Sequence, residues 1–233
     1  MPNELTLLIS LVASFSLMLV FFRLFGQRGL FCWVSLCTIL ANIEVNSLVI
    51  AFGMEQTLGN TLFASSFLAT DILSERYGKK AADRAVFVGI LTAVVFILFS
   101  LLWQVYIPSQ NDWALGEIKT LFAGTPRILL ASLLAYAISE LLDVWLYHAW
   151  WNFTAKKTGS RDAFLWVRNN GSTLISQLVN IVVFNFGAFL GVYELKTLFS
   201  ITGACYVIYV FTSLLDTPFM YLAKRLSPED LKN

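Results

Sequence analysis

Long apolar runs separated by short polar connections recur along the whole sequence. Residues 85–111, for example, contain no charged side chain. A membrane helix needs about 20 mainly apolar residues to cross a hydrocarbon core of roughly 30 Å. The sequence therefore predicts an all-α polytopic membrane protein, with a single transmembrane domain over residues 1–233. The seven predicted spans cover about residues 5–25, 30–53, 57–75, 82–106, 127–152, 171–192 and 197–223.

The composition supports a membrane location. Of the 233 residues, 58% are hydrophobic and only 13% are charged, whereas soluble domains carry about 25% charged residues. The formal net charge of +1 gives no reason to expect nucleic-acid binding. The first apolar run follows Glu4 instead of a basic segment and is too long for a cleaved signal peptide. We expect it to be the first membrane helix.

Basic residues predict the orientation, because cytoplasmic loops of membrane proteins carry an excess of Lys and Arg. If the chain has seven spans, one side of the membrane contains the basic clusters within residues 23–28, 76–84, 156–168 and 224–232. The other side receives Lys119, Arg127 and Lys196. This asymmetry predicts an external N-terminus and a cytoplasmic C-terminus.

Acidic side chains within the predicted spans are the strongest functional signal. An ionised group at the membrane centre costs at least ~2.5–3.5 kcal/mol on insertion scales. The acids concerned are Glu44, Asp71, Glu75, Glu140, Asp143 and Asp216. No Lys or Arg lies in the middle of a predicted span, so internal ion pairs cannot satisfy all six. We expect some to be protonated, hydrated or bound to a ligand.

Helical spacing places further polar side chains near these acids. The candidate substrate-binding residues are Asn42, Glu44, Asn46, Tyr136, Glu140, Asp143, Ser176, Gln177, Asn180, Tyr209 and Asp216. Asn42, Glu44 and Asn46 can point toward one site only if their helix is broken, as helices at transporter midplanes often are. The alternative interpretation is that such groups only join helices by hydrogen bonds.

A second set of acids lies near a predicted cytoplasmic end. Asp71 and Glu75 are one helical turn apart and are followed by Arg76, Lys79 and Arg84, any of which is a candidate ion-pair partner. We assign Asp71 and Glu75 to gating or proton coupling, with Arg76 as their counter-ion.

Motifs for catalysis and metal binding are missing from the sequence. The single histidine, His148, cannot build a His-based metal site, and no P-loop, G-x-S-x-G or H-E-x-x-H motif occurs. We expect no catalytic residue, no metal and no cofactor. A membrane-embedded enzyme is the third of the three functional hypotheses.

Four stretches carry a family resemblance. They read "ANIEVNSLVIAFGMEQTLGNTLFASSFLATDILSERYGKKAA", "RILLASLLAYAISELLDVWLYH", "LWVRNNGSTLISQLVN" and "LLDTPFMYLAKR". From about residue 30 to the C-terminus, the chain resembles the queuosine precursor transporters, a YhhQ-like family of vitamin uptake transporters.

The resemblance implies a multi-pass inner-membrane importer of 7-deazaguanines, such as preQ0, preQ1 or queuine, for tRNA queuosine modification. It also implies a six-helix core over residues 29–226, similar to the substrate-binding subunits of energy-coupling-factor transporters, with residues 1–28 as an additional helix. The alternative function is such a subunit, working with an ATPase module. The expected partners are the small-molecule substrate, the lipid bilayer and, in a homodimer, a second copy of the chain.

This sequence departs from the family pattern at four positions. Where this chain has Asn180 the family pattern has Asp, and where it has Tyr209 the pattern has Lys. A neutral hydrogen-bonding pair therefore replaces a buried ion pair in this chain. At the positions of Glu44 and Glu140 the family pattern has Gln. The two additional acids of this chain suit a cationic ligand such as preQ1. A carboxylate can accept the two adjacent donors of a deazaguanine edge, and we expect Glu140 or Glu44 to do so.

Overall fold

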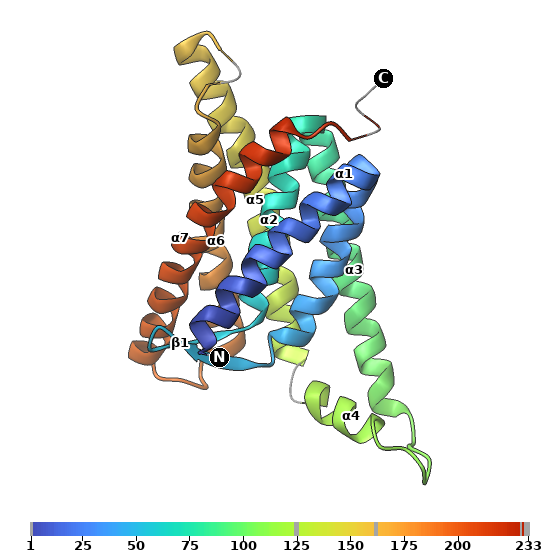
Figure 1. The fold of residues 1–233 in the computed structure, drawn as a ribbon. Coiled ribbons are helices and arrows are strands. Elements are labelled where there is room, and N and C mark those ends of the chain that lie inside the picture. The colour runs from blue at the N-terminus through green and yellow to red at the C-terminus, as the bar shows by residue number, and fades with distance from the viewer. Residues whose placement is uncertain (1, 124–125, 161–162, 229, 231–233) are drawn as a thin grey trace.

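The computed structural model describes residues 2–123, 126–160, 163–228 and 230. It is a helical bundle with one short hairpin (Figure 1). The helices are α1 (Asn3–Glu44), α2 (Gly59–Tyr77), α3 (Lys79–Val105), α4 (Leu115–Ala123), α5 (Pro126–Thr158), α6 (Leu165–Phe189) and α7 (Leu195–Arg225). The strands are β1 (Leu48–Ala51) and β2 (Met54–Thr57). Five helices, α1, α3, α5, α6 and α7, are long and apolar enough to cross a membrane.

The first two predicted spans are the two arms of α1. The helix is interrupted at Gly26, whose φ of 57° lies in the left-handed region that favours glycine. The chain reverses there, so that the second arm returns toward the end of the bundle where the first began (Figure 1). Asp230 packs on this corner and accepts a hydrogen bond from the backbone N–H of Gln27 at 2.9 Å.

The prediction that the second span extends to residue 53 was wrong. The helix ends at Glu44, and β1 and β2 pair antiparallel with Leu48 opposite Thr57. Phe52 and Gly53 form the two-residue turn, both with positive φ, as hairpin turns of this length require. The hairpin is joined to the start of α1, because Glu4 accepts a hydrogen bond from the Phe52 N–H at 2.9 Å.

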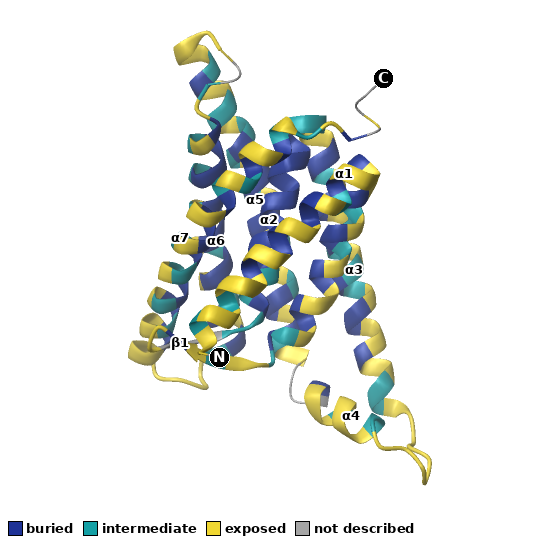
Figure 2. Cartoon of the chain, viewed as in Figure 1, coloured by how far each residue is buried: buried dark blue, intermediate teal, exposed yellow. Residues whose placement is uncertain are grey.

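Helix α2 lies at the centre of the bundle. Every residue from 63 to 74 is buried, and Figure 2 shows this helix as mainly dark blue. Because other helices surround it, α2 can carry polar side chains that a lipid-facing helix could not. The outer helices have the opposite pattern, with exposed apolar side chains such as Phe87 on α3 and Phe211 on α7.

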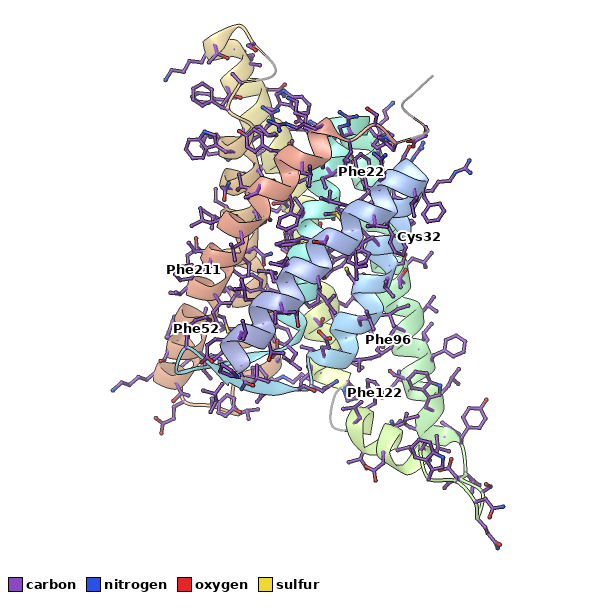
Figure 3. The ribbon with its side chains drawn as sticks, viewed as in Figure 1. Phe22, Cys32, Phe52, Phe96, Phe122 and Phe211 are labelled. Carbon is purple, nitrogen blue, oxygen red and sulfur yellow. The ribbon has the colours of Figure 1, made fainter. Side chains whose placement is uncertain are left out.

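The largest apolar cluster lies at the end of the bundle away from the hairpin. It joins Phe15 and Phe22 of α1 to Leu73 of α2, Tyr147 of α5 and Met220 of α7. Nearer the hairpin, an apolar groove runs between α1 and α7, and Phe52 and Phe211 line it (Figure 3).

Candidate functional site: a buried acidic cluster between four helices

Four carboxyl side chains meet in the interior of the bundle, and we call them the acidic cluster. They are Asp71 of α2, Glu140 and Asp143 of α5, and Asp216 of α7, each at most 1% exposed. Among the described residues, no basic side chain forms an ion pair with any of them. The structure thus brings together four of the six acids that the sequence singled out.

Glu140 is held by two hydroxyl groups of the central helix. Its Oε1 accepts a hydrogen bond from Ser66 at 2.8 Å, and its Oε2 accepts one from Thr70 at 3.0 Å. These two donors stand one turn apart on α2 and fix the orientation of the carboxyl group. A carboxylate has about four acceptor positions, so both oxygens keep capacity for a further donor.

Asp143 and Asp71 lie next to each other in the cluster. Their side chains are within hydrogen-bonding reach, and α6 contacts both of them. Ser176 donates to Asp143 at 2.7 Å, and Thr173 donates to Asp71 at 3.3 Å. Two ionised carboxylates in contact repel each other, whereas a pair that shares a proton forms a hydrogen bond.

Asp216 extends the cluster toward the end of the bundle that lies away from the hairpin. It accepts a hydrogen bond from Asn169 of α6 at 2.7 Å. The neighbouring Asn170 donates to Thr217 at 2.8 Å and accepts from Ser213 at 3.0 Å. The interface of α6 and α7 is therefore polar and buried at this level, as in a pathway for polar groups through a membrane protein.

Beyond Asp216, a buried ion pair closes this end of the bundle. Arg168 of α6 binds both oxygens of Glu75 of α2, with Nη2–Oε1 at 2.7 Å and Nε–Oε2 at 3.0 Å. Tyr147 donates to the same carboxylate at 2.9 Å, and Lys224 lies 3.3 Å from it. The guanidinium carbon of Arg168 also stands 4.6 Å from the ring centroid of Trp151.

The expectation that Arg76 is the counter-ion of these acids was wrong. Arg76 donates instead to the backbone oxygens of Lys224 and Leu226, at 2.8 and 2.9 Å, and so fixes the end of α7. The Arg76 guanidinium reaches backbone oxygens at the end of α7, whereas the Glu75 carboxylate is bound by side chains of α5, α6 and α7. Sequence reasoning counted Arg168 only as one of the basic residues near a membrane boundary and missed its role in the ion pair.

A narrow pocket opens at the hairpin end, and we call it the hairpin-end pocket. Its lining residues come from α2, α5, α6 and α7, together with Val45 after α1 and Thr57 of β2. The polar lining residues are Asn60, Ser132, Asn180, Asn185 and Tyr209, and the apolar ones include Phe63, Ile181 and Phe184. Asn180 and Tyr209 were expected here as site residues, whereas Asn60, Phe63 and Phe184 were missed.

Gln177 is a further buried polar side chain of α6. It is 1% exposed and lies on α6 between Asn180 of the pocket and Ser176 of the cluster. Its Oε1 accepts a long hydrogen bond from Asn180 at 3.5 Å, and its Nε2 has no partner among the described residues. On α5, Glu140 lies about 7.5 Å further along the helix than the lining residue Ala135, at 1.5 Å per residue.

Asn180 and Tyr209 do not form the neutral hydrogen-bonding pair that the sequence suggested. The Tyr209 hydroxyl donates to Oδ1 of Asn60 at 2.8 Å, and Asn180 turns to Gln177. Both side chains nevertheless line the same pocket. The expected pair was wrong because Tyr209 binds Asn60, which lies on a third helix, α2.

The candidates on α1 lie outside the acidic cluster. Asn42 is buried and donates to the backbone of Thr38 at 2.7 Å, and Asn46 donates to the backbone of Asn42 at 3.3 Å. Glu44 is half-buried at the end of the helix. Tyr136 is buried too, with its hydroxyl against Gly89 of α3. The helix is interrupted at Gly26 and ends at Glu44, and Glu44 lies outside the acidic cluster.

The fold and this site define a class of protein: a multi-pass membrane protein with exposed apolar helix faces and a buried acidic cluster in its interior. The comparisons with known proteins place it further. The family model described as "Putative vitamin uptake transporter" matches residues 57–223. The chain belongs to this family of membrane transporters, and it is not an enzyme.

Two curated relatives are similar over most of their length. The "Probable queuosine precursor transporter" of Bacillus subtilis is 36% identical over 221 residues, covering 94% of this chain and 93% of the relative. The "Queuosine precursor transporter" of Escherichia coli is 30% identical over 177 residues, or 73% of each chain. No solved structure matches this chain. The resemblance to queuosine precursor transporters is thereby confirmed, and so is a multi-pass protein of the inner membrane.

Proposed function

We propose that this protein imports 7-deazaguanine precursors of queuosine, such as preQ0 and preQ1, for tRNA modification. The observation that carries the proposal is the set of polar side chains buried in the bundle, namely the acidic cluster, Gln177 and the ion pair of Glu75 and Arg168, together with the polar residues that line the hairpin-end pocket. The names of both relatives support the same class of cargo.

A strain that cannot make preQ0 tests this function directly. We expect expression of the chain to restore tRNA queuosine when preQ0 or preQ1 is supplied at low concentration, because uptake then limits the modification. The measurement is the fraction of queuosine in tRNA, with empty vector and with queuine as a third supplement. No restoration with either precursor, despite normal amounts of protein in the membrane, would contradict the proposal.

We propose seven membrane crossings, with the N-terminus outside and the C-terminus in the cytoplasm. Counting the two arms of α1 and the central α2 with the four remaining long helices gives this number. The N- and C-termini lie at opposite ends of the bundle, and the C-terminal end carries the basic clusters (Figure 1). Residues 29–226 would then be the family core, and residues 1–28 an additional helix.

Within this arrangement, we propose that Glu140 binds the pairing edge of the base. It is preferred over Glu44, because it lies fully buried in the polar path and its carboxyl group is already oriented by Ser66 and Thr70. The guanine-type edge presents two adjacent N–H donors, which match the two carboxylate oxygens.

We further propose that Asp71 takes part in proton coupling through its contact with Asp143. A shared proton would leave this pair with one negative charge in place of two, and so remove the repulsion between the carboxyl groups while substrate moves past. In proteoliposomes containing only this chain, we expect an inwardly directed proton gradient to speed uptake several-fold. Asp71→Asn fixes the neutral state, so its uptake should be the same with and without the gradient.

The control for this coupling experiment is Asp112→Asn, because Asp112 is exposed in the loop before α4. It should keep the response to the gradient. Indifference of the wild-type protein to the gradient, or a normal response of Asp71→Asn, would contradict the coupling. Uptake by the chain alone would also argue against the alternative function, an energy-coupling-factor subunit that needs an ATPase module.

A further inference from the structure

An exposed apolar stripe runs along one face of α3. Its side chains recur every three or four residues, as those on one face of a helix do. They are Phe87, Leu91, Val95, Leu98, Leu102 and Val105, each between 45% and 77% exposed. At 1.5 Å per residue, the stripe from Phe87 to Val105 is about 27 Å long, close to the roughly 30 Å of a hydrocarbon core. The stripe therefore faces lipid, and Val105 lies at the membrane boundary.

The exposed apolar surface does not end at Val105. Tyr106, Ile107 and Trp113 are 64%, 92% and 87% exposed, and they belong to the connection between α3 and α4. Trp and Tyr are enriched at membrane–water interfaces, because their rings are apolar while the N–H or O–H group stays hydrated. The connection thus continues the lipid-facing surface of α3 near the hairpin end of the bundle (Figure 1).

Helix α4 turns only part of its apolar face toward the bundle. Phe122 is buried, with its ring centroid 5.7 Å from those of Phe96 and Trp103 on α3. Phe96 and Phe122 are labelled in Figure 3. Ile118 and Leu121, on the same side of the helix, remain 37% and 38% exposed. Aromatic packing therefore fixes α4 to α3 and leaves an apolar strip of α4 without cover from the described residues.

The polar residues of α4 lie beside this strip. Glu117 and Thr120 are three residues apart and share a second face of the helix, which is exposed too. Helices with one apolar and one polar face lie in the plane of the membrane interface, with the apolar side toward the acyl chains. Exposed apolar patches mark contacts with either a membrane or a protein. Continuity with the lipid-facing stripe of α3 favours the membrane.

We infer that residues 106–122 are an interfacial anchor, which lies among the phospholipid headgroups at the hairpin end of the bundle and does not cross the membrane. Trp113, Ile118 and Leu121 make its lipid contacts, and Phe122 joins it to α3. The anchor ties the end of α3 and the start of α5 to the membrane surface. This inference goes beyond the proposed function, since it concerns the bilayer and not the cargo.

Two neighbouring cysteine variants test the anchor in nanodiscs of phosphatidylethanolamine and phosphatidylglycerol. Ile118→Cys places a thiol on the apolar strip of α4, and Glu117→Cys places one on the polar face. A charged, water-soluble maleimide reacts with the thiolate, which forms poorly in apolar surroundings. We expect Ile118→Cys to be labelled at least tenfold more slowly than Glu117→Cys. The wild-type protein measures the labelling of the three native cysteines.

Trp113 provides a second measurement, because the bundle itself leaves this side chain 87% exposed. The difference in emission between the wild-type protein and Trp113→Phe isolates its indole from the rest of the seven tryptophans. Bromine atoms quench indole emission only at close range. With bromine on the upper carbons of the acyl chains, we expect this difference to fall by more than half.

Two results would overturn the anchor. One is equal labelling of Ile118→Cys and Glu117→Cys in the nanodiscs, and the other is Trp113 emission that brominated phospholipid leaves unchanged. Equal labelling in nanodiscs combined with slow labelling of Ile118→Cys in whole cells would replace the bilayer by a protein partner on this face.

Discussion

Glu140→Gln should lower the kcat/KM of deazaguanine uptake by about 10- to 100-fold, the largest effect we expect from a single isosteric change. Charge-assisted hydrogen bonds contribute about 1.5–3 kcal/mol each, and about 1.4 kcal/mol corresponds to a factor of ten. The amide also turns a donor toward Ser66 or Thr70, which now donate to the carboxyl group. Initial rates of labelled preQ1 uptake in cells that lack their own synthesis measure the effect.

Two further variants separate recognition from folding at this position. Ser66→Ala removes one of the hydroxyl groups that orient Glu140 and should raise KM by a smaller factor. Glu117→Gln, on the exposed surface of α4, should transport normally at the same membrane level. Wild-type kinetics in Glu140→Gln would refute the assignment of base recognition to this residue and would return attention to Glu44.

Arg168→Met should strongly destabilise the protein, because it removes the bidentate partner of the buried Glu75 carboxylate and leaves it only Tyr147 and the longer contact with Lys224. The Arg168 side chain is fully buried and that of Glu75 is 5% exposed. Removing one partner of such a pair typically costs about 3–5 kcal/mol. We expect a clear drop in the Tm of the detergent-solubilised protein, and partial recovery in the neutral double variant Glu75→Gln/Arg168→Met.

The surface pair of Lys79 and Asp83 provides the matched control, since both side chains are more than a third exposed. Lys79→Gln should shift the Tm little, because exposed ion pairs contribute little to stability. If Arg168→Met behaved like Lys79→Gln, the ion pair would not hold the end of the bundle closed. In the double variant, a faster leak of substrate out of proteoliposomes would support its role as a gate.

The hairpin shows where sequence reasoning reached its limit. Residues 48–51, "LVIA", are as apolar as the second arm of α1, so hydropathy over a window as long as a membrane span extends the helix through them despite the polar residues at 42, 44, 46 and 47. The turn that ends the run depends on positive φ at Phe52, a conformation that is rare for an aromatic residue. Its hydrogen bond to Glu4, 48 residues earlier in the chain, could not be read from local sequence.

The ion pair of Glu75 and Arg168 illustrates the same limit for the site. The two residues are 93 positions apart, and Arg76 and Lys79 are far closer to Glu75 in the sequence. Proximity along the chain favoured Arg76 and Lys79 as partners of Glu75. The partner was decided instead by the direction in which the Glu75 side chain leaves α2. Asn60 was missed for a related reason, since a single Asn near the start of a helix gives no signal until Tyr209 and Phe184 are placed beside it.

The sequence by itself determined the membrane class, the approximate positions of the helices and the acids that need an explanation. These follow from hydropathy and from the cost of burying charge, which depend on composition along a segment. Only the tertiary structure decided which acids meet, that Glu75 pairs with Arg168, and that uncharged residues of four helices line a pocket at the hairpin end. Those outcomes depend on which faces of α2, α5, α6 and α7 are turned toward each other, and this is fixed by packing between segments distant in the chain.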